Sequence, residues 1–164
     1  MSIAQAMLAE FDHESQTTRR FLERVSPDKL MWRPHPKSHT LGELALHVAT
    51  VTEFVTRFAL VDASPIPSES EVYRQPASAQ EILTSFDKSV AAVKQILGTL
   101  DDAALMKNWS ALVDGKPVMT LPKATMLRLF MLNHWIHHRG QLGVYLRLTG
   151  AKVPSSYGPS GDEG

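Results

Sequence analysis

The sequence predicts an all-α protein in which residues 1–164 form a single domain, a four-helix bundle with a short β-hairpin before the fourth helix. Two observations lead to this prediction. Hydrophobic residues recur at helical spacing in four long segments. Several prolines occur in each of the first two connections between these segments, where they interrupt helix. A chain of 164 residues is also long enough to bury a hydrophobic core.

The first predicted helix runs from about Ser2 to Val25 and is followed by Pro27. The second begins at Thr40 and reaches about Leu60. Thr40 is followed three residues later by Glu43, which is a capping box in which each side chain satisfies a free backbone N–H group. The hydrophobic stripes of the two helices are Ile3, Met7, Phe11, Thr18, Leu22 and Val25, and Leu44, Val48, Val51, Val55 and Phe58.

The third predicted helix opens at Ser78 with a second capping box, completed by Glu81, and ends near Gly98. The fourth starts near Pro122 and runs to Leu148, with Gly150 as its C-terminal cap. The stripe of the third helix is Ile82, Phe86, Val90, Val93 and Leu97.

Two connections carry further information. Asp114-Gly115 lies between two short runs of strand-forming residues, so this dipeptide predicts a tight hairpin. The connection from Val61 to Ala77 is long enough to cross the bundle, and the topology therefore need not be a plain up-down-up-down arrangement.

The composition argues against several classes of protein. The formal net charge is zero and no lysine or arginine run is present, which argues against nucleic acid or an anionic membrane as a partner. No apolar run approaches the roughly 20 residues of a membrane span. The N-terminus lacks the pattern of a signal peptide, and the chain has no cysteine. We therefore expect a cytoplasmic protein without disulfides.

The fourth predicted helix is apolar on nearly all sides, which predicts that it is buried on more than one side. Its apolar residues are Leu127, Leu129, Phe130, Met131, Leu132, Trp135 and Ile136. Gly140 and Gly143 would allow another backbone to approach closely. This pattern favours a homodimer; the alternative is that this helix is simply the most central one.

Three histidines lie at positions that favour a metal site. His134 and His138 are four residues apart, which places both rings on one face of the fourth helix. His47 lies on the inward stripe of the second helix. Three buried imidazoles are costly to satisfy separately, whereas one divalent metal ion satisfies all three. Three protein ligands leave a coordination position open, which is typical of a catalytic site. The alternative is a set of core histidines with ordinary hydrogen bonds.

Other candidate residues are weaker. His137 competes as a ligand but points about 100° away from His138. His13 is predicted to be exposed, as are His35 and His39, although the last two are also placed to border a pocket. Glu43 and Gln141 lie one turn from ligands; a cap is favoured for Glu43 and packing or capping for Gln141. Trp32 and Trp109 are predicted to be core or pocket wall. No His-Glu-x-x-His motif or serine nucleophile motif is present.

Several segments resemble the DinB/YfiT-like superfamily of metal-binding proteins. They are Trp32–Ser38, Thr40–Ala49, Asn133–Leu142, Val144–Leu148 and Tyr157–Glu163. The resemblance covers nearly the whole chain and implies a four-helix bundle of non-simple topology that is often dimeric. The superfamily's histidine triad falls on His47, His134 and His138, and its metal is commonly nickel or zinc.

The resemblance implies two reaction types for a small-molecule substrate. Some relatives are thiol-dependent S-transferases that use low-molecular-weight thiols, and others are described as hydrolases. We therefore expect a metal-dependent hydrolase or thiol S-transferase, with the catalytic residues beyond the ligands unknown. The alternative is a non-catalytic, dimeric, metal-binding stress-response module. The family name alone suggests DNA, which the zero net charge does not favour.

Overall fold

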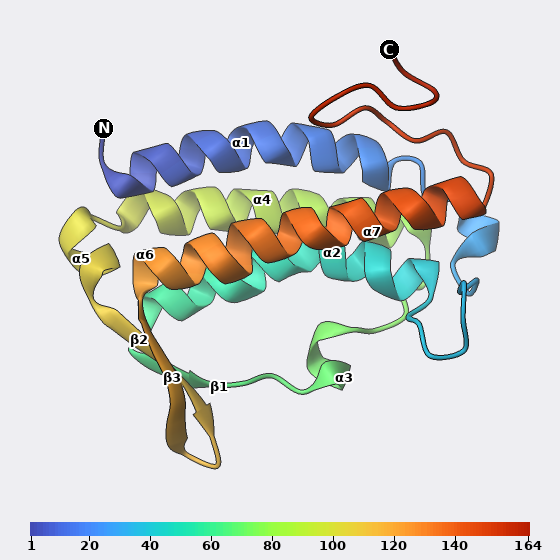
Figure 1. Ribbon diagram of the computed structural model, residues 1–164. Coiled ribbons are helices and arrows are strands. Elements are labelled where there is room, and N and C mark those ends of the chain that lie inside the picture. The colour runs from blue at the N-terminus through green and yellow to red at the C-terminus, as the bar shows by residue number, and fades with distance from the viewer.

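The computed structural model describes residues 1–164, and its long helices lie side by side (Figure 1). They are α1 (Ile3–Leu22), α2 (Leu41–Thr56), α4 (Ala79–Thr99) and α7 (His134–Leu148). In Figure 1, α1 and α7 run in one direction and α2 and α4 run in the other. Because α2 and α4 are parallel, the chain between them returns along the helices, so the topology is not a plain up-down-up-down one.

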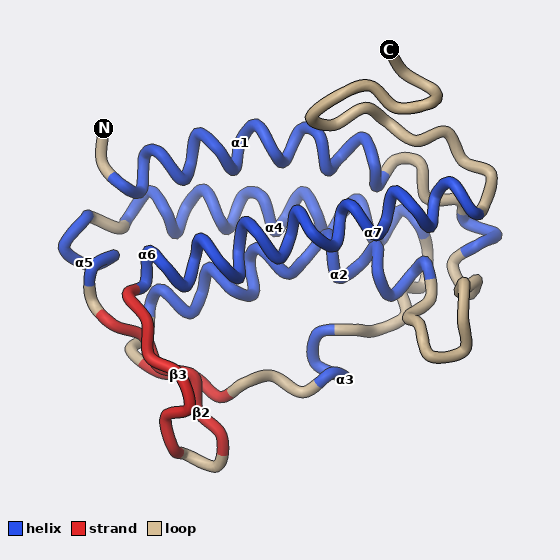
Figure 2. The backbone as a smooth tube through the Cα atoms, viewed as in Figure 1, coloured by secondary structure: helices blue, strands red, loops and turns tan.

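Short elements fill the connections. The helices are α3 (Glu69–Val72), α5 (Asp102–Met106) and α6 (Lys123–Met126), and the strands are β1 (Ala63–Pro65), β2 (Asn108–Val113) and β3 (Lys116–Pro122). Strand β2 pairs antiparallel with β3 and parallel with β1 (Figure 2). The all-α prediction was therefore wrong in part, since the chain is mainly helical but carries a three-stranded sheet. A three-residue strand in a proline-rich segment is too short to show a period in the sequence.

The predicted hairpin is confirmed. Asp114 and Gly115 have φ angles of 49° and 74°, so both central residues of the turn are left-handed. Two consecutive left-handed residues match the twist of the flanking strands, which explains why Asp-Gly suits this turn.

The predicted capping box is formed at α2, whereas at α4 only one of its two hydrogen bonds is formed. The Glu43 backbone N–H donates to Thr40 Oγ1 at 3.0 Å, and the Thr40 N–H donates to Glu43 Oε2 at 2.7 Å. At α4, the Glu81 N–H donates to Ser78 Oγ at 3.1 Å. The Glu81 carboxylate, however, accepts from the backbone N–H of Ala77 and pairs with Arg74 rather than returning to Ser78.

The fourth predicted helix is one rod of three parts. Pro122 ends β3, α6 follows, and a π-helical stretch, Leu127–Asn133, leads directly into α7. Wider π turns change which side chains share a face, and such turns are frequent at functional sites. This one ends at the residue before His134, so it changes the faces only of residues that precede the histidine pair.

The hydrophobic core lies between the long helices, and the predicted stripes point into it. Trp135 is fully buried and stacks on Phe11, with ring centroids 5.2 Å apart. Its indole Nε1–H donates to the Val48 carbonyl oxygen at 2.8 Å, so its one polar group is satisfied. α1 ends at Leu22, earlier than predicted, and Val25 is buried just beyond it. None of the helices is both long enough and apolar enough to cross a lipid bilayer.

The outer face of α7 carries exposed hydrophobic residues. Val144 and Leu148 are each 59% exposed. Gly143 was expected to allow another backbone to approach closely, but it is packed against a side chain of the same chain, since a Cβ there would lie 3.1 Å from the Phe21 ring. Gly140 faces open space. The homodimer therefore stays a prediction.

Gly42 and Gly140 provide a matched pair of substitutions. A Cβ at Gly42 would lie 2.5 Å from Gln75 Nε2 and 3.0 Å from the Leu30 carbonyl oxygen, whereas a Cβ at Gly140 has no neighbour within 4 Å. We expect Gly42→Ala to destabilise the fold by about 1–3 kcal/mol through overpacking. We expect Gly140→Ala to stabilise it by about 0.5–1 kcal/mol through helix propensity. Urea unfolding of both variants measures the two values, and equal values would contradict the packing at Gly42.

Candidate metal site

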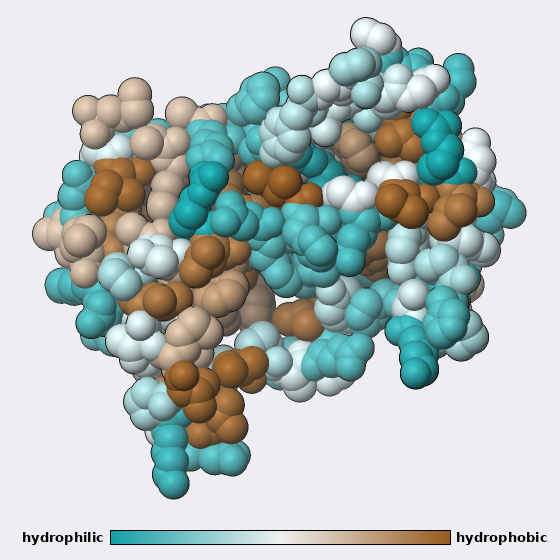
Figure 3. Space-filling model, viewed as in Figure 1, coloured by the Kyte–Doolittle hydropathy of each residue, from teal (hydrophilic) through white to brown (hydrophobic).

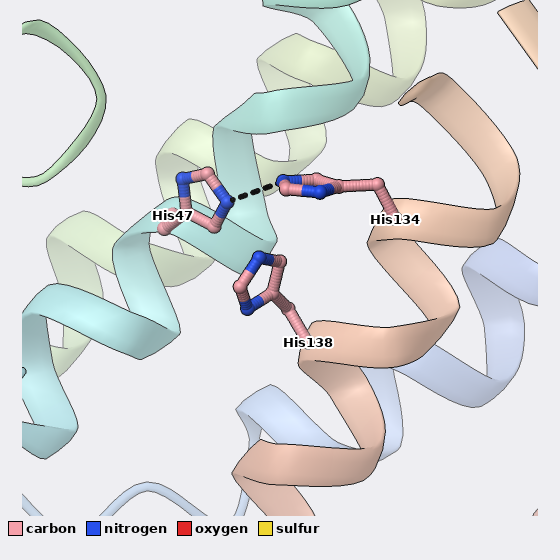
Figure 4. A group of neighbouring side chains, drawn as sticks. All are labelled: His47, His134 and His138. Atoms are coloured by element: carbon pink, nitrogen blue, oxygen red, sulfur yellow. Dashed lines mark hydrogen bonds between the residues drawn. The ribbon is translucent and has the colours of Figure 1, made fainter. Parts of the chain in front are cut away.

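The three predicted histidines meet between α2 and α7. His47 projects from α2, and His134 and His138 project from the first turns of α7 toward it (Figure 4). His47 is 3% exposed and His138 is 9% exposed, while His134 is half-buried. One ring nitrogen from each lies within 4.8 Å of the others, so the three histidines are positioned to hold a metal ion.

One pair of nitrogens has a spacing that a shared ion would allow. His47 Nε2 and His134 Nε2 are 3.2 Å apart. Two nitrogens bound to one tetrahedral zinc ion at about 2.0–2.1 Å lie about 3.3–3.4 Å apart. A single hydrogen bond from His134 to His47 gives the same distance, but it leaves the Nε2 atom of His138 without a role. The donor set, three imidazoles without a carboxylate, suits zinc, nickel, iron or copper.

Oxygen acceptors orient two of the rings. His47 Nδ1 donates to the Val72 carbonyl oxygen at 3.1 Å, and His138 Nδ1 donates to Gln141 Oε1 at 2.7 Å. Because an oxygen acceptor places the proton on Nδ1, the Nε2 atom of each ring keeps its lone pair. Oxygen partners of this kind are typical behind metal-ligating histidines.

All three rings are neutral near pH 7. Burial, and then the neighbouring His138, lower the pKa of His47 to about 3. Burial, and then His134, lower the pKa of His138 to about 4. Burial and the nearby His137 also lower the pKa of His134. A neutral imidazole is the form that ligates metal, so protons compete weakly for these nitrogens at neutral pH.

Tyr73, which the sequence analysis missed, packs against the site. Its ring stacks on His47 with centroids 4.3 Å apart and on His39 with centroids 3.6 Å apart. Burial and the nearby Glu69 raise its pKa, so the phenol keeps its proton. Tyr73 and Val72 lie in the long connection before α4, where no periodicity places a residue against α2. In the sequence, the only sign of this contact was a single tyrosine in a proline-rich connection.

The other candidate residues differ in their exposure and in their contacts with the site. His13, His35 and His137 are exposed, as predicted for the first two. His39 is half-buried against Tyr73 and borders a shallow recess, so the pocket alternative was correct for it. Glu43 caps α2, whereas Gln141 contacts a candidate ligand instead of only packing.

Two hollows adjoin the histidines. The first is a cavity of about 340 Å³ whose wall includes His47, His134 and Tyr73. Trp109, predicted to be core or pocket wall, is 4% exposed and forms part of this wall. The second is a recess of about 280 Å³ that also reaches His47 and is lined by charged side chains, namely Glu53, Arg57, Glu71 and Arg74.

Gln141 allows a test of the oxygen partners. We expect Gln141→Leu to weaken metal binding by about 10-fold or somewhat more, because His138 loses the acceptor that fixes its tautomer and orientation. Gln141→Glu keeps an acceptor oxygen and is expected to bind metal at least as tightly as the wild type. Competition titration with a chromophoric chelator measures both variants. Equal weakening in both would show that the Gln141 oxygen does not act through His138.

The sequence of this chain is similar to that of other proteins. The chain matches the family model described as the DinB family over residues 1–164. It is 29% identical over 158 residues to the uncharacterized protein YrdA of Bacillus subtilis (strain 168), covering 95% of this chain and 89% of that protein.

Solved structures show the same fold. A DinB-like protein from Bacillus cereus ATCC 10987 superposes with a TM-score of 0.72 at 27% identity, covering 93% of this chain and 97% of the other. The DinB-like protein YjoA from Bacillus subtilis gives a TM-score of 0.72 at 20% identity over the same shares. The match of the family model over the entire length shows that this chain belongs to the DinB family.

Proposed function

We propose that the protein binds one divalent ion, nickel or zinc, through His47, His134 and His138. With this ion bound, the protein acts as a metal-dependent hydrolase or thiol S-transferase. The observation that carries this proposal is that the three ring nitrogens converge within 4.8 Å beside a cavity that His47 and His134 help to line. Three ligands leave room for a further group on the ion, and the cavity leaves room for a substrate.

A bound ion supplies Lewis acidity and makes water or a thiol nucleophilic near neutral pH, which is the shared basis of the two reactions. The protein's own groups do the rest. The Val72 carbonyl oxygen and Gln141 hold the rings of His47 and His138 in one orientation. Tyr73 stacks on His47, forms part of the cavity wall and keeps its phenol protonated.

Cobalt substitution tests whether the site has an open position. Visible absorption of the Co²⁺ protein reports its coordination, and we expect acetohydroxamate to change this spectrum by occupying the open position. An unchanged spectrum despite bound cobalt would support the non-catalytic module instead. Hydrolysis of 4-nitrophenyl acetate, and thiol transfer to 1-chloro-2,4-dinitrobenzene, then separate the two reaction types in the zinc and nickel proteins.

The dimeric module is kept as the second candidate because of one specific observation. Val144 and Leu148 are exposed one turn apart on α7, and Gly140 leaves space one turn earlier. We expect the wild type to sediment as a homodimer and Val144→Glu to sediment as a monomer. Met31→Glu, at a residue that is 69% exposed outside α7, is the control. A monomeric wild type would remove this candidate.

A further inference from the structure

We propose that the substrate carries an uncharged, apolar group of about two rings that fills the 340 Å³ cavity, with its reacting end at His47 and His134. This inference rests on the proposed function and names the substrate class of the same site. The cavity is continuous with the candidate metal site, because two of the three candidate ligands form part of its wall.

The wall contains no carboxylate, lysine or arginine. Apart from His47, His134 and Tyr73, the lining residues are Val51, Phe54, Val55, Phe58, Pro65, Ile66, Pro67, Val72, Trp109, Ala111, Met119 and Phe130. A charged substrate group placed there would lose its hydration without gaining a partner, which is costly. An apolar group instead gains about 25 cal/mol for each Å² removed from water. The lining therefore favours an uncharged, apolar substrate group.

Aromatic rings shape the part of the cavity away from the histidines. Phe58 stacks on Trp109 with centroids 5.4 Å apart, and Phe54 meets Phe58 edge to face at 5.2 Å. The indole Nε1–H of Trp109 already donates to Ser64 Oγ at 3.0 Å. Trp109 therefore offers the cavity its apolar surface only, which suits a flat aromatic or branched alkyl group.

The volume sets the size of the group. An engineered apolar cavity of about 150 Å³ in another protein binds benzene. A cavity of about 340 Å³ is roughly twice as large, and so it suits two fused rings or an alkyl group of similar bulk.

The mouth of the cavity lies beside the hairpin. Ile66 and Met119 are 51% and 37% exposed and both belong to its wall. Figure 3 shows hydrophobic surface gathered over this part of the molecule, at the lower left of the view, next to a hollow below the helices. A substrate that enters here meets apolar side chains before it reaches the histidines.

Two ligand series test the inference. The first uses the metal-free protein and 6-acetyl-2-dimethylaminonaphthalene, an uncharged two-ring fluorophore whose emission shifts to the blue in apolar surroundings. We expect saturable binding with a blue shift. The second uses the zinc protein and three hydroxamates. We expect 2-naphthohydroxamate to bind at least 10-fold more tightly than acetohydroxamate, and a carboxylate on the far ring to remove most of this gain.

Adjacent residues of β3 provide matched variants. Met119 lies in the cavity wall, whereas its neighbour Val118, which is 57% exposed, does not. We expect Met119→Asp to weaken binding of the fluorophore at least 5-fold and Val118→Asp to leave it within 2-fold of the wild type. Equal loss in both variants, or no binding to the wild type because a second copy or another segment fills the cavity, overturns the inference.

The two series also separate this inference from the proposed function. If zinc binds but the naphthyl group gains nothing over the methyl group, the substrate class is wrong and the metal site stands. The opposite result is that the fluorophore binds, Met119→Asp weakens its binding, and no metal binds. The cavity is then a site for apolar ligands, and the proposed metal-dependent function is wrong.

Discussion

Replacing His138 by alanine is expected to abolish stoichiometric metal binding. The variant removes one of three nitrogens that lie within 4.8 Å of one another. Loss of an oxygen partner behind a ligand commonly costs 10- to 100-fold in affinity, so we expect loss of the ligand itself to cost at least about 100-fold. Elemental analysis of purified protein should therefore give about one nickel or zinc ion per wild-type chain and almost none per variant chain.

His137→Ala is the matched control for this experiment. It removes an imidazole from the neighbouring position of the same helix, but His137 is exposed and is not among the three converging rings. We expect its metal content to equal that of the wild type, with unchanged circular dichroism in both variants. A metal content in His138→Ala equal to that of the wild type would exclude His138 as a ligand. A wild type that takes up no metal would leave the contact between His47 and His134 as an ordinary hydrogen bond.

The candidate ligands were predictable because each lies in a regular helix. A ring at His134 and another at His138 share a face in any α-helix, and His47 interrupts a stripe of otherwise apolar residues. The π-helical stretch before His134 changes the register only upstream of the pair, and the ring faces therefore stay as the sequence predicts.

The rest of the site was not predictable because it depends on segments without a period. Val72 and Tyr73 follow a four-residue helix in the connection between α2 and α4, and their contacts with His47 exist only after this connection folds back along the bundle. The same holds for β1, whose pairing with β2 joins residues 63–65 to residues 110–112. Such contacts have a long sequence separation and no local signature.

One missed feature did have a signal in the sequence. Glu14 falls on the hydrophobic stripe of α1 between Phe11 and Thr18, and Arg139 falls between Trp135 and Leu142 on α7. A single charge within an apolar stripe on each of two helices indicates a buried ion pair, since an isolated buried charge is too costly. In the structure the two side chains do meet, with Arg139 Nη1 2.5 Å from Glu14 Oε2.

Removing Arg139 from this pair is expected to cause the largest loss of stability. Glu14 is 4% exposed and Arg139 is 2% exposed. The guanidinium also donates to the Glu14 carbonyl oxygen, to Thr18 Oγ1 and to Tyr157 Oη, and that hydroxyl donates to Glu14 Oε1 at 2.8 Å. Arg139→Ala leaves a buried carboxylate unpaired, so we expect the free energy of unfolding to fall by about 3–5 kcal/mol.

Two further variants show whether the unpaired charge is the cause. Arg147→Ala also removes an arginine of α7 from an ion pair, with Asp162, but that side chain is 50% exposed, so we expect a loss of about 1 kcal/mol or less. The double variant Glu14→Met with Arg139→Met replaces both charges by apolar groups and is expected to recover most of the stability lost in Arg139→Ala. Urea unfolding followed by circular dichroism measures all three variants. If the double variant is no more stable than Arg139→Ala, the unpaired Glu14 carboxylate is not the cause, and the lost hydrogen bonds of Arg139 to Thr18 and Tyr157, which methionine cannot form, account for the effect. Arg139 would then join α7 to α1 mainly through the hydrogen bonds that its guanidinium donates.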